Sequence, residues 1–165
     1  MLTSNEREMF ALQVMTEVRR WSGVEMRPHP SAERPGDQDG VEFRYAGRQL
    51  GHMHDTCAVH LSLTRALKQS VVSEGLAEPL TTSPDSCWVM FNPIVAPDVE
   101  RAIWLMRLNF VRFRRQRLTL DASAASTLLQ EHEAALETVS ANVATVLRKT
   151  QLRSKPRPLP ELPVT

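Results

Sequence analysis

Apolar residues recur at helical spacing near the start of the chain, at Phe10, Val14, Val18 and Trp21. Their intervals of four, four and three residues place them on one face of a helix. Thr3 and Glu6 have the spacing of a capping box, in which each side chain satisfies a backbone N–H group of the other residue. The sequence therefore predicts an amphipathic helix that begins after Thr3 and ends near Gly23.

Alternation of apolar and polar residues predicts strands in the next part of the chain. Val41, Phe43 and Tyr45 alternate with Glu42 and Arg44, as in a strand with one buried face. The short turn that follows contains a glycine and favours a tight hairpin. We expect strands at residues 24–27, 41–45, 48–54, 57–63 and 87–92.

Two polar stretches predict loops between these elements. Pro28 is expected to end the first strand, and residues 30–40 form a loop rich in proline, glycine and charged side chains. Residues 77–86 form the second loop.

Three further helices are expected, at residues 64–74, 97–117 and 121–149. The helix at 97–117 carries one apolar stripe for a sheet and a second stripe at Trp104, Leu108 and Val111. One stripe is enough for a helix that lies on a sheet, so the second needs another partner. The heptad-like spacing of Leu129, Leu136 and Val143 offers that partner, either within the same chain or in another copy.

These elements predict an α+β fold, in which an antiparallel sheet of about four to five strands has helices packed on one face and a long C-terminal helix is added. We expect an α+β domain at residues 1–118 and a helical extension at 119–150. Residues 151–165 predict a disordered proline-rich tail, whose RPLPELP segment has the form of a polyproline II ligand.

The composition favours a cytoplasmic protein that does not enter a membrane. Hydrophobic residues make up 42% of the chain and charged residues 24%, and the formal net charge is +1. Such a charge gives no strong attraction to nucleic acids or membranes. The two cysteines are too few for a disulfide framework, which favours a reducing compartment. We find neither a signal peptide nor an apolar run of the roughly 20 residues that span a bilayer.

Three of the five histidines fall within nine positions of the predicted hairpins. His52 and His54 share a face because side chains alternate along a strand. A three-residue turn would pair position 52 with His60 and bring all three imidazoles to that face, whereas a two-residue turn would pair it with position 59. Three histidines with an open fourth position can hold Zn²⁺ and activate water. The alternative is that these are ordinary surface or half-buried histidines.

The helix at 97–117 carries a series of arginines that is a second candidate functional group. They are Arg107, Arg112, Arg114 and Arg115. Clustered guanidinium groups bind phosphates, so this face could contact nucleic acid. The near-neutral chain favours another interpretation, in which the arginines pair with Glu131, Glu133 and Glu137 of the last helix.

Four segments resemble, in order, the family of small bacterial proteins called the luciferase domain family, whose functions are largely uncharacterised. The segments are VEFRYAGRQLGHMH, EGLAEP, SPDSCWVMF and APDVERAIWLMRLNF, and the resemblance extends over about residues 24–113. It implies the same α+β order of elements. The chain departs from the family pattern at Cys87, where the family has glycine, at His60, where it has an acidic residue, and in the long loop 30–40.

Three functions are consistent with these features. The leading hypothesis is a non-catalytic binding or assembly module, which docks on a protein partner or on itself through the helices at 97–117 and 121–149. The second hypothesis is a metal-dependent enzyme that uses His52, His54 and His60, with Zn²⁺ as the expected ion. The third is nucleic-acid binding through the arginine series.

Overall fold

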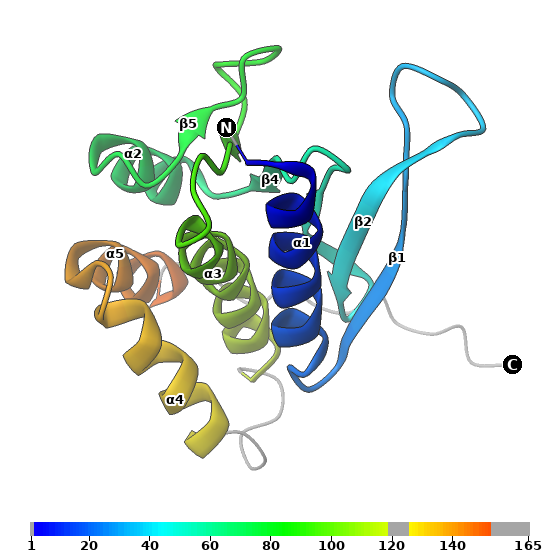
Figure 1. The fold of residues 1–165 in the computed structure, drawn as a ribbon. Coiled ribbons are helices and arrows are strands. Elements are labelled where there is room, and N and C mark those ends of the chain that lie inside the picture. Colours follow the sequence, from blue (N-terminus) through cyan, green and yellow to red (C-terminus); the bar gives the residue numbers. More distant parts are fainter. Residues whose placement is uncertain (1, 119–125, 153–165) are drawn as a thin grey trace, which may run out of the picture.

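The computed structural model describes residues 2–118 and 126–152 and confirms the α+β class (Figure 1). The helices are α1 (Ser4–Arg19), α2 (Arg65–Ser73), α3 (Asp98–Leu118), α4 (Ser126–Glu137) and α5 (Ala141–Leu152). The strands are β1 (Val24–Pro30), β2 (Gln38–Tyr45), β3 (Arg48–Met53), β4 (Val59–Ser62), β5 (Glu78–Pro79) and β6 (Trp88–Phe91).

The strands form one antiparallel sheet in the order β1-β2-β3-β4-β6-β5. The described part of the chain thus has six strands in its sheet, slightly more than the four to five expected. The additional strand is β5, which consists of two residues in the region expected to be a loop. A strand of two residues is too short for hydrophobic alternation to reveal it.

Helix α1 forms as its sequence pattern predicts. The Thr3 side chain accepts from the backbone N–H of Glu6, and the Glu6 carboxylate accepts from the backbone N–H of Thr3 at 2.8 Å. Phe10, Val14 and Val18 are buried on one face. These contacts hold α1 beside α3 and against the sheet.

The two faces of the sheet have different environments. Phe43 and Tyr45 of β2 point toward the helices, where the Tyr45 ring lies 5.2 Å from the Phe110 ring of α3. Because side chains alternate along a strand, Glu42 and Arg44 point to the opposite face. The hydrophobic core therefore lies between the sheet and α1 and α3, and the second face carries polar groups.

Strand β1 runs past the point at which it was expected to end. It continues through Pro28 to Pro30, which corrects the prediction that Pro28 stops it. Proline lacks only a backbone donor, and β1 lies at the edge of the sheet, where one side of the strand needs no partner. Strand β2 likewise begins at Gln38, inside the predicted loop 30–40.

Two irregularities set the register around β3. A bulge in β3, where Leu50 is the extra residue opposite Phe43 and Arg44 of β2, brings Glu42 opposite His52. The following turn pairs His52 with His60, which is the longer of the two turns considered from the sequence. Cys57 in that turn has a positive φ of 70°.

The C-terminal helical segment is two helices rather than one long helix. The chain leaves the helical conformation after Glu137, and Ser140 caps the next helix by accepting from the backbone N–H of Val143 at 3.0 Å. The Ser140 hydroxyl also donates to the Glu74 carboxylate at 2.6 Å. The break therefore lets α5 pack against α2 while α4 packs against α3. Residues 121–125 of the predicted helix lie outside the described residues.

The second apolar stripe of α3 is covered within the same chain. Trp104 is 2% exposed, and its indole N–H donates to the backbone carbonyl of Leu136 at 3.1 Å. The residues predicted to meet a partner are all buried, namely Trp104, Leu108, Val111, Leu129, Leu136 and Val143. In this conformation they form the interior of the α3–α4–α5 layer.

Among the described residues, none of the helices combines the length and the apolar character needed to cross a bilayer. The predicted proline-rich tail from residue 153 onward lies outside the described residues.

Candidate metal site on the second face of the sheet

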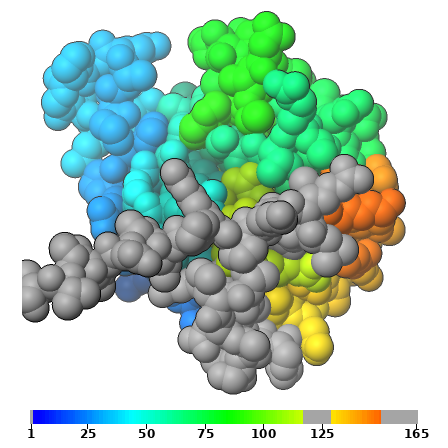
Figure 2. Space-filling view, turned by 180° about the vertical axis from the view of Figure 1, so that it is seen from behind, coloured from blue at the N-terminus to red at the C-terminus, as the bar shows by residue number. Residues whose placement is uncertain are grey.

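Four of the five histidines gather on the face of the sheet opposite α1 and α3. His29 comes from β1, His52 from β3, His54 from the residue after β3, and His60 from β4. Neighbouring rings in this histidine cluster have centroids 3.8–5.5 Å apart. Seen from behind, the β1–β2 hairpin and the loop before β6 stand out as two lobes, with a hollow between them (Figure 2).

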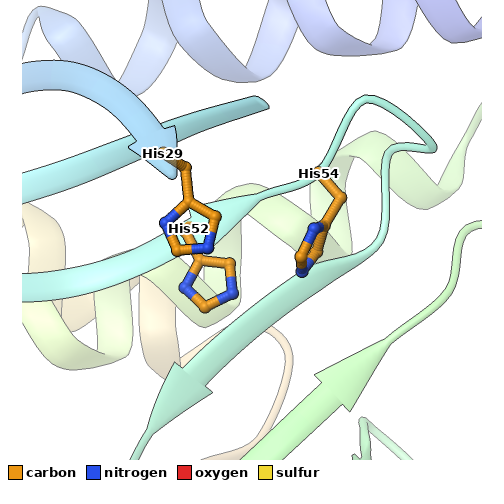
Figure 3. Close-up of side chains that lie close together, drawn as sticks. All are labelled: His29, His52 and His54. Carbon is orange, nitrogen blue, oxygen red and sulfur yellow. The ribbon is translucent and has the colours of Figure 1, made fainter. Parts of the chain in front are cut away.

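Three of these rings converge on one point. His29 and His52 are stacked, with centroids 3.8 Å apart and planes inclined by 11°. The His54 ring stands nearly perpendicular to both, and the edges of the stacked pair that face it carry nitrogen atoms (Figure 3). One nitrogen from each of the three rings lies within 4.8 Å of the other two.

These separations are close to those of a zinc site. Tetrahedral nitrogen ligands at 2.0–2.1 Å from Zn²⁺ are about 3.3 Å apart, so each ring needs to move inward by about 1 Å. Rotation about a side-chain bond supplies such a movement without a change in the backbone.

Asp39 orients the His54 ring. Nδ1 of His54 lies 2.6 Å from Oδ2 of Asp39, while Oδ1 of the same carboxylate accepts from the backbone N–H of Asp55 at 3.2 Å. The carboxylate accepts the Nδ1 proton of His54 and leaves a lone pair on Nε2. A carboxylate behind a histidine is the usual second shell of a histidine metal ligand.

Glu42 and Gln49 lie behind the stacked pair. Oε2 of Glu42 is 4.0 Å from Nδ1 of His29 and accepts from Nε2 of Gln49 at 3.0 Å. The Gln49 nitrogen is also 3.0 Å from Nδ1 of His52. Each of the three converging rings therefore has a polar residue at its Nδ1 side.

The electrostatics favour neutral imidazoles. Burial, with the neighbouring His29, His54 and His60, lowers the pKa of His52 to about 3. Burial and the same crowding lower the pKa of His60 to about 4 and also lower the pKa of His29. These rings are neutral at pH 7, each with one proton, and the neutral imidazole is the form that binds metals.

The carboxylate of Asp39 is charged under the same conditions. Burial by itself would raise the pKa of Asp39, but hydrogen bonds from His54 and from the Asp55 N–H lower it overall. A charged carboxylate beside uncharged rings gives the cluster a negative local field, which attracts a cation.

His60 lies against the trio but outside its point of convergence. Its Nδ1 is 3.2 Å from Nε2 of His54. When the single proton of His54 is on Nδ1 and is donated to Asp39, Nε2 of His54 accepts a hydrogen bond from Nδ1–H of His60. The structure thus brings all three sequence-predicted histidines together, while the nitrogens that converge belong to His29, His52 and His54.

Sequence reasoning missed three members of this site. The sequence does not point to His29, because Pro28 looks like the end of its strand, nor to Asp39, because the polar segment around it has the composition of a loop. Glu42 was placed on the correct face, but the bulge in the β2–β3 pair, which brings it opposite His52, was not foreseen. Gly51, a glycine inside a predicted strand, was the available signal for that bulge.

The arginine series of α3 is engaged within the chain. Arg112 is 7% exposed and donates to the backbone carbonyl of Ser62 at 3.0 Å. Arg115 forms an ion pair with Glu133 of α4, as the alternative interpretation of the series expected.

The other two arginines also face groups of the same chain. Arg107 lies 3.3 Å from the Glu17 carboxylate, and the Arg114 guanidinium lies 5.8 Å from the centre of the Phe110 ring. Nucleic-acid binding through this series stays a prediction, and these contacts do not test it.

A hollow of about 510 Å³ lies between α1 and the β2–β3 hairpin, next to the histidine cluster. Its lining includes Met15 of α1 together with Gly40, Met53, His54 and Asp55. It offers room for a small molecule beside His54.

Comparison with known proteins gives one family. Residues 47–109 match the family model described as "Luciferase domain", which covers β3 to the first half of α3 and includes His52, His54 and His60. His29, Asp39 and Glu42 lie before the matched segment. No curated protein and no solved structure matches the chain. The resemblance noted in the sequence is therefore confirmed for residues 47–109, over less than half of the chain.

Proposed function

We propose that the histidine cluster binds a divalent transition-metal ion, with Zn²⁺ as the first candidate, through His29, His52 and His54. The observation that carries this proposal is the convergence of one nitrogen from each ring within 4.8 Å. Imidazole ligands suit Zn²⁺, Cu²⁺ and Ni²⁺, whereas Mg²⁺ and Ca²⁺ prefer oxygen. The low pKa of His52 supports the proposal, because binding then requires little competition with protons at neutral pH.

The chemistry that follows is that of a metal-dependent enzyme. Three histidine ligands leave one position of a tetrahedral ion open to water, whose pKa such an ion lowers to about 7. His60 stands beside His54, where its ring can hydrogen-bond to a water in that position.

A direct test combines metal content with thermal stability. The purified protein is stripped with chelator, titrated with Zn²⁺ and melted. At free Zn²⁺ of 100 times the dissociation constant, binding adds about 2.7 kcal/mol to the free energy of unfolding. For a chain of this size that corresponds to a rise of about 5–10 °C in the melting temperature.

Variants locate the ion. His29→Ala, His52→Ala and His54→Ala should each lose most of the stabilisation by Zn²⁺, because each removes one of three ligands. His132→Phe is the matched control: it removes an imidazole that lies between Trp21 and Phe110, among the helices. Equal Zn²⁺ stabilisation in the control and in the three cluster variants would refute the site.

Docking on a protein partner remains a second proposal, with a different surface from the one predicted. Four apolar side chains are more than half exposed, namely Met9 and Leu12 of α1 and Ile94 and Val95 before α3. Exposed apolar side chains of this kind support association with another protein or a second copy. Light scattering of the wild type and of Met9→Lys/Leu12→Lys tests it. Association that is lost in the variant supports docking on a second copy, whereas a wild type that stays monomeric at all concentrations contradicts it.

A further inference from the structure

The amide of Gln49 links a carboxylate to a histidine of the cluster. Its Nε2 lies 3.0 Å from Oε2 of Glu42 and 3.0 Å from Nδ1 of His52. A charged carboxylate only accepts hydrogen bonds, so the amide atom that faces Glu42 must be the NH₂ group. That same NH₂ group therefore donates to Nδ1 of His52.

This contact fixes the tautomer of His52. A neutral imidazole carries one proton, and Nδ1 is an acceptor here, so the proton resides on Nε2. Nε2 of His52 then has no lone pair for a metal ion. A histidine whose outer nitrogen binds a metal instead carries its proton on Nδ1 and donates it to an acceptor behind the ring.

His29 lacks a hydrogen-bond partner at its Nδ1 atom. This atom is buried, and the nearest carboxylate oxygen, Oε2 of Glu42, is 4.0 Å away. That oxygen already accepts from Gln49. A buried polar atom without a hydrogen-bond partner is destabilising, so a rearrangement that gives Nδ1 of His29 a partner is favoured.

We propose that Gln49 is a positioning residue that gates the metal site by turning its amide through half a turn. The inference rests on the proposed function, because the gate controls the same three-histidine site. After the turn, Oε1 of Gln49 accepts from Nδ1–H of His52, and Nε2 of His52 gains its lone pair. Glu42, released from Gln49, accepts from Nδ1–H of His29.

The rearrangement conserves protons and charge. His52 takes up a proton on Nδ1 and releases the proton on Nε2 to solvent, so the ring is neutral before and after the exchange. All three ligands then have one acceptor each at Nδ1, which is Glu42 for His29, Gln49 for His52 and Asp39 for His54. Metal binding and the orientation of Gln49 are therefore coupled.

Nitrogen chemical shifts of the imidazoles test the gate, since protonated, unprotonated and metal-bound nitrogens resonate at different positions. Histidine-labelled protein is measured stripped of metal and then loaded with Zn²⁺. We expect His52 to carry its proton on Nε2 without metal and on Nδ1 with Zn²⁺. His54, whose Nδ1 faces Asp39, should keep its proton on Nδ1 in both states.

Two substitutions separate the gate from simple packing. Gln49→Glu removes the NH₂ donor, and the one proton that the new carboxyl group shares with Glu42 lies between the two carboxyl groups. The oxygen of the new carboxyl group that faces His52 then accepts, so His52 should already carry its proton on Nδ1 before metal is added. Gln49→Leu offers no acceptor and should weaken Zn²⁺ binding about 10- to 100-fold, the usual effect of losing such a partner. Gln13→Glu and Gln13→Leu, at an exposed position of α1, are the matched controls and should change neither property.

The outcomes distinguish the gate from the proposed function. A protein that takes up Zn²⁺ through the cluster but shows the same His52 tautomer before and after overturns the gate alone. So does a Gln49→Leu variant that binds Zn²⁺ as tightly as the wild type. A protein with the expected tautomers that takes up no Zn²⁺ overturns the proposed function, and the gate with it.

Discussion

Gly40 is the residue at which the site depends most on the absence of a side chain. It has a φ of 90°, and a Cβ atom there would lie 1.9 Å from the backbone oxygen of Met53 and 2.8 Å from Cα of His54. The close approach brings the neighbouring Asp39 within reach of the His54 ring. A side chain at this position would have to push β2 away from the end of β3.

Gly40→Ala is therefore expected to lower the free energy of unfolding by more than about 3 kcal/mol and to abolish Zn²⁺ binding, because it combines strained backbone with a clash against main chain. Gly36→Ala is the matched control: its φ is 95°, but nothing lies within 4 Å of the added atom. Gly36→Ala should lower the free energy of unfolding by about 1 kcal/mol and leave Zn²⁺ binding unchanged. Urea unfolding and Zn²⁺ titration measure both, and equal costs at the two glycines would contradict the interpretation.

Part of the site could be predicted residue by residue. Period-two alternation was enough to place His52 and His54 on one face, because that rule needs only local backbone geometry. His29 could not be reached in this way, since a proline before it looks like a strand end unless the strand is known to lie at an edge. The partnership of Asp39 with His54 depends on a close backbone approach that only the folded hairpin creates.

At the scale of elements, the break between α4 and α5 depends on Ser140. This residue is 6% exposed, caps α5 through the Val143 N–H, and bonds to the Glu74 carboxylate of the segment after α2. The heptad-like spacing of the sequence predicted one continuous helix because the apolar residues of α4 and α5 have similar phase. Ser140, which interrupts the helix, bonds to Glu74, a residue 66 positions earlier in the chain. Local periodicity carries no information about so distant a partner.

Ser140→Ala should therefore lower the free energy of unfolding by about 1–2 kcal/mol, the usual cost of a lost helix cap. Thr138→Ala, at an exposed threonine in the same connection, is the matched control and should change it by about 0.5 kcal/mol or less. Chemical denaturation compares the two variants. A Ser140→Ala protein as stable as the control would show that packing alone sets the break.

At the scale of the whole molecule, the sequence predicted the fold class and the need to cover α3, but it did not identify the covering segment. The two apolar stripes of α3 follow from helical periodicity. Whether α4 covers the second stripe in the same chain or in another copy depends on the path of the connection, which periodicity does not describe. The structure places α4 of the same chain there, through the Trp104–Leu136 hydrogen bond.

Buried histidines should make stability depend on pH. Burial lowers the pKa of His52 to about 3 and those of His60 and His132 to about 4, against about 6.5 in an unfolded chain. Below pH 6.5 the unfolded chain binds more protons than the folded one, so the contribution of these groups to stability is complete above pH 6.5 and is lost toward pH 4. Asp39 and Glu74 are carboxylates with lowered pKa values, and their contribution to stability is lost at still lower pH.

Metal-free protein should therefore unfold more easily in urea at pH 5 than at pH 7, with a loss of about 1.4 kcal/mol per pH unit for each histidine that stays neutral in the folded state. His132→Phe, which removes one such group from the helical layer, should reduce that slope. An equal free energy of unfolding at the two pH values would contradict the burial of neutral imidazoles.

The central claim is that three histidines from separate parts of the sheet hold one metal ion. X-ray absorption at the zinc edge of the protein loaded with one equivalent of Zn²⁺ measures this coordination directly. The account predicts three imidazole nitrogens at about 2.0–2.1 Å with one further light atom, and a loss of imidazole scattering in His29→Ala. Sulfur scattering at about 2.3 Å, or a coordination shell of water that is unchanged in His29→Ala, would contradict it.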